Sequence, residues 1–204
     1  ASYFINLCNP EKIEASKERI LSSCVIGNYI NAKYIVFHPG YYGNLSAEEA
    51  YEFVRKGCIE LSKLIKKNKL NVFLGLETTG KKSQFGTLDE ILKICKEIKI
   101  CRPVVDFAHI YARNGGKINY SEIFDKLEKF SYLHTHFSGI EFTDKGERRH
   151  IPISSKHPDF DELAKELVNR GFTTKKRDIV IISESPVLEQ DSLKMMKILK
   201  KYEK

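Results

Sequence analysis

The chain has 204 residues, of which 42% are hydrophobic and 30% are charged, and its 34 lysines and arginines against 27 acidic residues give a formal net charge of +7. This composition excludes a disordered chain because it supplies ample apolar material for a core, and no apolar run approaches the roughly 18 residues of a membrane-spanning helix. The positive charge permits a polyanionic partner such as a nucleic acid, although lysines spread along helix faces account for much of it.

Short apolar runs alternate with longer amphipathic stretches along the whole chain. The runs predict strands buried on both faces and cover residues 3–7, 34–37, 72–76, 103–107, 132–137 and 179–183. The stretches between them predict helices at 13–31, 46–68, 87–98, 120–130, 159–170 and 189–202. Two of these helices begin with the capping boxes Ser46-x-x-Glu49 and Thr87-x-x-Glu90, in which a side chain accepts from an otherwise unpaired backbone amide.

The regular alternation of strand and helix predicts an α/β fold with a parallel sheet. Six such units fit either an open sheet or three quarters of an eight-stranded barrel, which usually needs about 250 residues. Neither a G-x-G-x-x-G nor a P-loop motif is present, which disfavours the nucleotide-binding open sheets. We expect one partial TIM-barrel domain over residues 1–204 that lacks an N-terminal portion.

The cysteine pattern and the first residues of the chain indicate the cellular compartment of the protein. The five cysteines are scattered, odd in number and never spaced as C-x-x-C, which is typical of reduced, buried thiols in an intracellular protein: Cys8, Cys24, Cys58, Cys95 and Cys101. The first residues show no secretory signal pattern. We therefore expect a cytoplasmic protein that does not associate with a membrane.

Ionisable residues lie at or near the carboxyl ends of five successive predicted strands. They are His38, Glu77, Asp106 with His109 three residues later, His134 and Glu184. The carboxyl ends of parallel barrel strands open onto one face, so these groups are expected to converge there, at a large desolvation and repulsion cost that divalent cations would offset. Imidazole and carboxylate ligands without thiolate suit zinc, manganese, iron or cobalt.

A second group, Glu147-Arg148-Arg149-His150, follows the fifth of the six predicted strands. Glu147 and His150 could hold a further metal while either arginine contacts a phosphate; the alternative is an ordinary charged loop. His136 is interpreted as a supporting or packing residue.

At these residues the sequence resembles endonuclease IV, the metal-dependent apurinic/apyrimidinic endonuclease family of the xylose isomerase-like TIM barrels. The resemblance runs nearly end to end through short motifs whose order and spacing are specific: residues 2–7, 37–40, 76–77, 105–109, 133–134, 149–150 and 183–186. It implies a chain that lacks the first two strand–helix units of that family.

The resemblance implies three metals, usually zinc, with manganese as an alternative. His38 and Glu77 would serve the first metal, and Glu77 would bridge to a second that is completed by Asp106, His134 and Glu184; His109 and His150 would hold the third. The first ligand of the family, a histidine, would precede Ala1. The family also has an aspartate two residues before its last histidine, where this chain has Arg148; Glu147 is the expected substitute, with Asp144 and Glu141 as alternatives.

The resemblance further implies hydrolysis of the phosphodiester 5′ to an abasic site in duplex DNA by a monomeric DNA-repair enzyme, with Glu77, Asp106 and Glu184 as catalytic carboxylates. The residues expected to contact DNA are Tyr3, Lys81, Lys82, Arg113, Arg148 and Arg149. Two other functions remain open: a sugar isomerase or epimerase on the same barrel, and a truncated barrel that binds metal or DNA without turnover.

Overall fold

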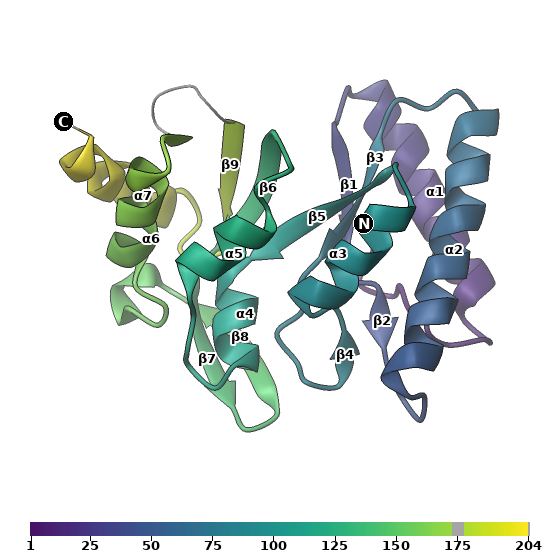
Figure 1. Ribbon diagram of the computed structural model, residues 1–204, viewed down its shortest axis with the longest axis horizontal. Coiled ribbons are helices and arrows are strands. Elements are labelled where there is room, and N and C mark those ends of the chain that lie inside the picture. Colours follow the sequence, from purple (N-terminus) through teal and green to yellow (C-terminus); the bar gives the residue numbers. More distant parts are fainter. Residues whose placement is uncertain (173–177, 204) are drawn as a thin grey trace. The chain divides into compact units, whose positions relative to one another are not determined.

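The computed structural model describes residues 1–172 and 178–203. The chain divides into two compact units, Ala1–Val104 and Val105–Lys204. Parallel strands with helices beside them form each unit (Figure 1). The fold is the α/β arrangement of a TIM barrel, as the sequence predicts, and the described residues contain five parallel strands where the sequence predicts six.

The first unit contains three of these parallel strands. Its elements are α1 (Ile13–Tyr29), β1 (Tyr34–Phe37), β2 (Gly40–Tyr41), α2 (Ala47–Lys67), β3 (Phe73–Glu77), β4 (Gln84–Phe85), α3 (Leu88–Glu97) and most of β5 (Cys101–Asp106). β3 pairs in parallel with β1 on one side and with β5 on the other, and the short β2 and β4 pair antiparallel. Both predicted capping boxes are confirmed, at Ser46 for α2 and at Thr87 for α3.

The second unit contains the other two parallel strands and a hairpin. Its elements are α4 (Phe107–Arg113), α5 (Tyr120–Lys126), β6 (Tyr132–Phe137), β7 (Gly139–Thr143), β8 (Gly146–Ile151), the 3-10 helix η1 (Ile153–Ser155), α6 (Phe160–Asn169), β9 (Asp178–Ser183) and α7 (Glu189–Tyr202). β6 and β9 are parallel, and β7 and β8 form an antiparallel hairpin. The core includes Phe107, whose ring centroid is 5.9 Å from that of Phe124 and 6.4 Å from that of Phe137.

The strand predicted over residues 3–7 is not present. Tyr3 and Phe4 are 97% and 77% exposed, which a strand buried on both faces would not allow. The Leu7 amide donates to the Pro39 carbonyl at 2.8 Å, just beyond β1, without forming a ladder. The apolar run in the sequence therefore reflects the buried side chains of Ile5 and Leu7 in a turn-rich segment.

None of the described helices combines the length and apolar character that crossing a membrane requires.

All five cysteines lie in the first unit and are buried free thiols, as expected. Burial raises the pKa of Cys8 and of Cys24 to about 12, so both stay protonated near neutral pH. Because the thiolate is the nucleophile, we expect the native protein to react with fewer than one equivalent of Ellman's reagent per chain within minutes, and with five after unfolding in guanidinium. Rapid labelling of several thiols in the native protein would contradict this burial.

Candidate metal centre

In the first unit, a histidine and a glutamate meet where two neighbouring strands end. Phe37 of β1 pairs with Leu76 of β3, so the next residues, His38 and Glu77, stand at the same level. His38 Nε2 lies 3.3 Å from Glu77 Oε2, and Glu77 is buried. The parallel register therefore brings two sequence-predicted ligands together.

In the second unit, Asp106 ends β5 and is the N-cap of α4. Its Oδ1 accepts a hydrogen bond from the His109 backbone amide at 2.8 Å, which satisfies one orphan amide of the helix. The same cap places His109 Nδ1 3.6 Å from Asp106 Oδ2. The three-residue spacing is thus that of a helix cap, and it brings two fully buried potential ligands to one place.

A β-bulge in the β7–β8 hairpin sets the orientation of Glu147 and His150. Ile140 pairs with His150, and Phe142 pairs with Glu147, so Arg148 is an extra residue in β8 with no partner of its own in β7. Because strand side chains alternate with a period of two, Glu147 and His150, three residues apart, would face opposite sides of a regular strand. The extra residue restores them to the same face.

The hairpin packs on α4 (Figure 1). Ile140 forms a buried cluster with Ala108 and Ala112 of α4. As a result, His150 and Glu147 both reach the α4 histidine. His109 Nε2 lies 3.3 Å from His150 Nε2 and 3.6 Å from Glu147 Oε2.

Glu184 lies between two histidines of the second unit. Its Oε1 is 3.0 Å from His136 Nδ1, and its Oε2 is 3.8 Å from His150 Nε2. It follows β9 directly, and its amide donates to the Phe137 carbonyl at the end of β6 at 3.1 Å. The end of the parallel β6–β9 ladder therefore positions the Glu184 carboxylate, just as the ends of β1 and β3 position His38 and Glu77 in the first unit.

His136 lies closer to this centre than its interpretation as a supporting residue implied. Side chains two residues apart on a strand share a face, and the rings of His134 and His136 have centroids 5.3 Å apart. His136 is two residues nearer than His134 to the carboxyl end of β6, where Glu184 lies. In the part of the chain that the structure describes, the groups of converging ligand atoms include His136 and do not include His134.

The donor set fits a metal. One ligand atom each of Asp106, His109, His150 and Glu184 lie within 4.8 Å of one another, and the same holds for Asp106, His136 and Glu184. Two ligands about 2.1 Å from a tetrahedral zinc lie roughly 3.4 Å apart, and the 3.3 Å between the two histidine nitrogens matches that spacing. The two groups share both carboxylates, which suits neighbouring cations.

Ser138 supports His150 from the side opposite its potential metal-binding nitrogen. The fully buried Ser138 Oγ lies 2.6 Å from His150 Nδ1, which leaves Nε2 directed at His109, Glu147 and Glu184. Because such a partner fixes the tautomer and the ring orientation, we expect Ser138→Ala to weaken metal binding by about 10- to 100-fold. Competition with a chromophoric chelator measures this, and an unchanged dissociation constant would assign Ser138 to packing alone.

The residues predicted to contact DNA occupy several exposed segments. Tyr3 is exposed near the start of the first unit, and Lys81 and Lys82 lie in the turn between β3 and β4. In the second unit Arg113 ends α4, and Arg148 and Arg149 project from β8. The two hairpin arginines have side chains 64% and 69% exposed, and both contact Glu141, at 2.5 and 2.6 Å. Glu141, one of the alternative ligands, thus contacts both arginines.

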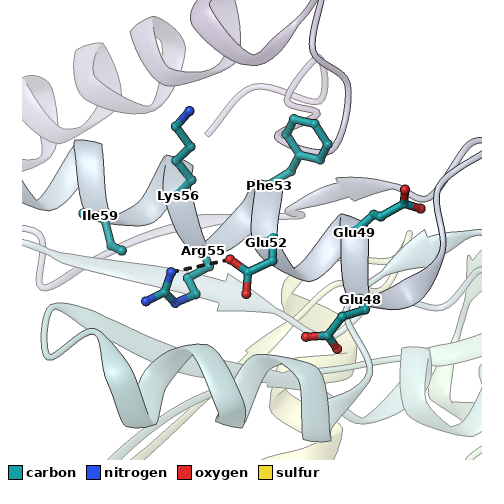
Figure 2. A pocket seen from close by; sticks show the side chains of 7 residues that line it. All are labelled: Glu48, Glu49, Glu52, Phe53, Arg55, Lys56 and Ile59. Carbon is teal, nitrogen blue, oxygen red and sulfur yellow. Dashed lines mark hydrogen bonds and ion pairs between the residues drawn. The ribbon is translucent and has the colours of Figure 1, made fainter.

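A separate hollow lies on α2, lined by Glu48, Glu49, Glu52, Phe53, Arg55, Lys56 and Ile59 (Figure 2). Its Arg55–Glu52 contact, at 3.5 Å, joins one turn of the helix. None of these residues is a predicted site residue.

Comparisons with known proteins give a matching family model, sequence relatives and solved structures of similar fold. Residues 1–202 match the model of the xylose isomerase-like TIM barrel family. An uncharacterized protein of Methanocaldococcus jannaschii is 38% identical, over 97% of this chain and 74% of its own length. A probable endonuclease 4 of Mycoplasma mobile is 29% identical, over 93% of this chain and 68% of its own length. Among solved structures, a D-tagatose 3-epimerase-like protein superposes with a TM-score of 0.75 at 20% identity, over 99% of this chain and 74% of its own.

Proposed function

Because the chain belongs to the xylose isomerase-like TIM barrel family, whose members include metal-dependent enzymes, we propose that it is a metal-dependent DNA-repair endonuclease. Its substrate would be the phosphodiester 5′ to an abasic site in duplex DNA. The name of the 29% identical Mycoplasma mobile relative, probable endonuclease 4, supports the proposal from sequence.

One structural feature carries the proposal: the bulged β7–β8 hairpin adds Glu147 and His150 to the pair formed by Asp106 and His109. A sugar isomerase or epimerase needs one or two metals held by fewer ligands, and Asp106, His136 and Glu184 alone would suit it. The added His109–Glu147–His150 set gives the second unit donors for a further cation. A cluster of cations suits a phosphodiester, whose charge must be neutralised on the attacking and departing sides.

The ligands would divide between the two units. We propose that the second unit holds zinc or manganese with Asp106, His109, His136, Glu147, His150 and Glu184, and that His38 and Glu77 serve a cation in the first; His134 stays a candidate ligand. When bound, such cations supply water activated at neutral pH and positive charge beside the phosphate. The protein would supply the carboxylates that balance the charge of these cations, of which Glu77 and Asp106 are buried.

Arg148 and Arg149 would bind phosphates that flank the cleaved bond. Both guanidinium groups are exposed, and Glu141 orients them. The hydrogen bond from Arg149, together with the charge of Arg148, lowers the pKa of Glu141, so this carboxylate is charged at neutral pH. A phosphate would replace or share this carboxylate through charge-assisted hydrogen bonds. Each such phosphate contact makes the affinity for DNA fall as the salt concentration rises. The lesion itself would be recognised because flipping out a nucleotide that has lost its base costs little unstacking energy.

The test is incision of a 5′-labelled duplex that carries one abasic-site analogue, with the undamaged duplex as control. We expect cleavage on the 5′ side of the lesion only, which stops when a chelator removes the metals and returns when zinc or manganese is added back. Two or three metals per chain by elemental analysis would accompany this activity. Absence of incision by the metal-loaded protein, together with epimerisation of a ketose, would replace the nuclease with a sugar enzyme.

A further inference from the structure

A buried carboxylate outside the ligand set joins the two segments that carry Glu184 and His150. Asp191 lies in the first turn of α7 and is fully buried. Its Oδ2 accepts a hydrogen bond from Ser185 Oγ at 2.6 Å and another from the Ile153 amide at 2.8 Å. Lys194 Nζ lies 2.8 Å from its Oδ1.

The two groups that donate to Asp191 Oδ2 lie next to candidate metal ligands. Ser185 directly follows Glu184 and is itself buried, and Ile153 begins η1, three residues after His150. A single oxygen atom thus binds the loop after β9 and the segment after β8. These segments carry Glu184 and His150, whose facing atoms are 3.8 Å apart.

Asp191 is charged in the folded protein. Burial alone would raise its pKa, but the hydrogen bonds from Lys194, Ser185 and the Ile153 amide together lower that pKa below its usual value. Hydrogen bonds to an ionised acceptor are shorter and stronger than neutral ones, so the contact is a stiff one.

We propose that Asp191 is a positioning residue that fixes the separation of Glu184 and His150 and thereby sets the metal affinity of the second unit. This inference rests on the proposed metal centre. Asp191 contacts neither ligand itself and acts through Ser185 and the Ile153 amide. Residues that orient metal ligands in this way typically change metal affinity by 10- to 100-fold when they are lost.

The test uses Co²⁺, whose visible absorption reports ligand geometry, on the full chain without DNA. Asp191→Ala removes both hydrogen bonds to Oδ2, whereas Asp191→Asn keeps an oxygen that can accept them. Ser185→Ala releases only the Glu184 side and serves as the second variant if Asp191→Ala does not fold. Asp161→Asn is the matched control, because Asp161 accepts from Tyr202 of α7 at 2.8 Å and contacts neither ligand-bearing segment.

We expect Asp191→Ala and Ser185→Ala to bind Co²⁺ about 10- to 100-fold more weakly with an altered spectrum, and Asp191→Asn and Asp161→Asn to stay within about threefold of wild type. Lower stability with an unchanged Co²⁺ affinity and spectrum would reduce Asp191 to a structural role. Wild-type protein that binds Co²⁺ with this dependence but does not cut DNA would refute the nuclease alone. Wild-type protein that binds no Co²⁺ would overturn both proposals.

Discussion

Glu184→Gln is expected to lose about 10²- to 10³-fold of the incision rate at an abasic site, the range found when one preorganised electrostatic group is removed from an active site. The two oxygens of Glu184 face different histidines, His136 at 3.0 Å and His150 at 3.8 Å. The amide keeps the size of the side chain but removes its charge and one of its acceptors. Single-turnover cleavage with saturating metal measures the effect, and elemental analysis should show a lower metal content.

Glu189→Gln is the control for this change. Glu189 is an exposed glutamate in the first turn of α7, five residues beyond Glu184 and not among the converging ligand atoms. The same chemical substitution there should leave both incision and metal content unchanged. If Glu184→Gln cleaved at the wild-type rate, Glu184 would not belong to the reacting centre and the nuclease would need a different set of carboxylates.

Much of the fold follows from the local sequence because short runs rich in β-branched and aromatic residues mark strands and capping boxes mark helix starts. β1 and β6 have the bounds that the apolar runs predict, and α2 and α3 begin where their capping boxes indicate. The hairpin β7–β8 has no such signature, since its strands carry charged residues and pack mainly on α4. α4 itself is seven residues long and follows β5 without a break, so its periodicity is too short to detect.

Site residues at the ends of strands were predictable from the sequence. Site residues whose orientation depends on the pairing between two strands were not. His38, Glu77, Asp106 and Glu184 each end or follow a strand, and that position is visible in the sequence. His136 could have been recognised from the period-two rule that places it on the face of His134. The bulge could not, because it depends on which residues of β7 lie opposite Glu147 and His150.

That bulge leads to a prediction with a large effect, in which two changes of one residue have opposite results. Removing Arg148 leaves Glu147 and His150 two residues apart, which places them on the same face of a regular strand. Inserting an alanine between Arg148 and Arg149 places them four residues apart, which adds about 7 Å to their separation along a regular strand, so that both can no longer lie beside His109 unless two residues bulge out in place of one. We expect the deletion variant to keep the wild-type metal content, and the insertion variant to lose one metal per chain together with about 10²-fold of its activity.

The two variants also separate metal binding from phosphate binding at the hairpin. The deletion variant retains one arginine in place of two, so its salt dependence of DNA binding should be shallower by roughly one phosphate contact. Elemental analysis and DNA-binding titrations at several salt concentrations distinguish the two effects. Equal metal content in both variants would mean that Glu147 and His150 do not bind the same ion. The separation of Glu147 and His150 that the bulge sets would then have no bearing on the chemistry of the site.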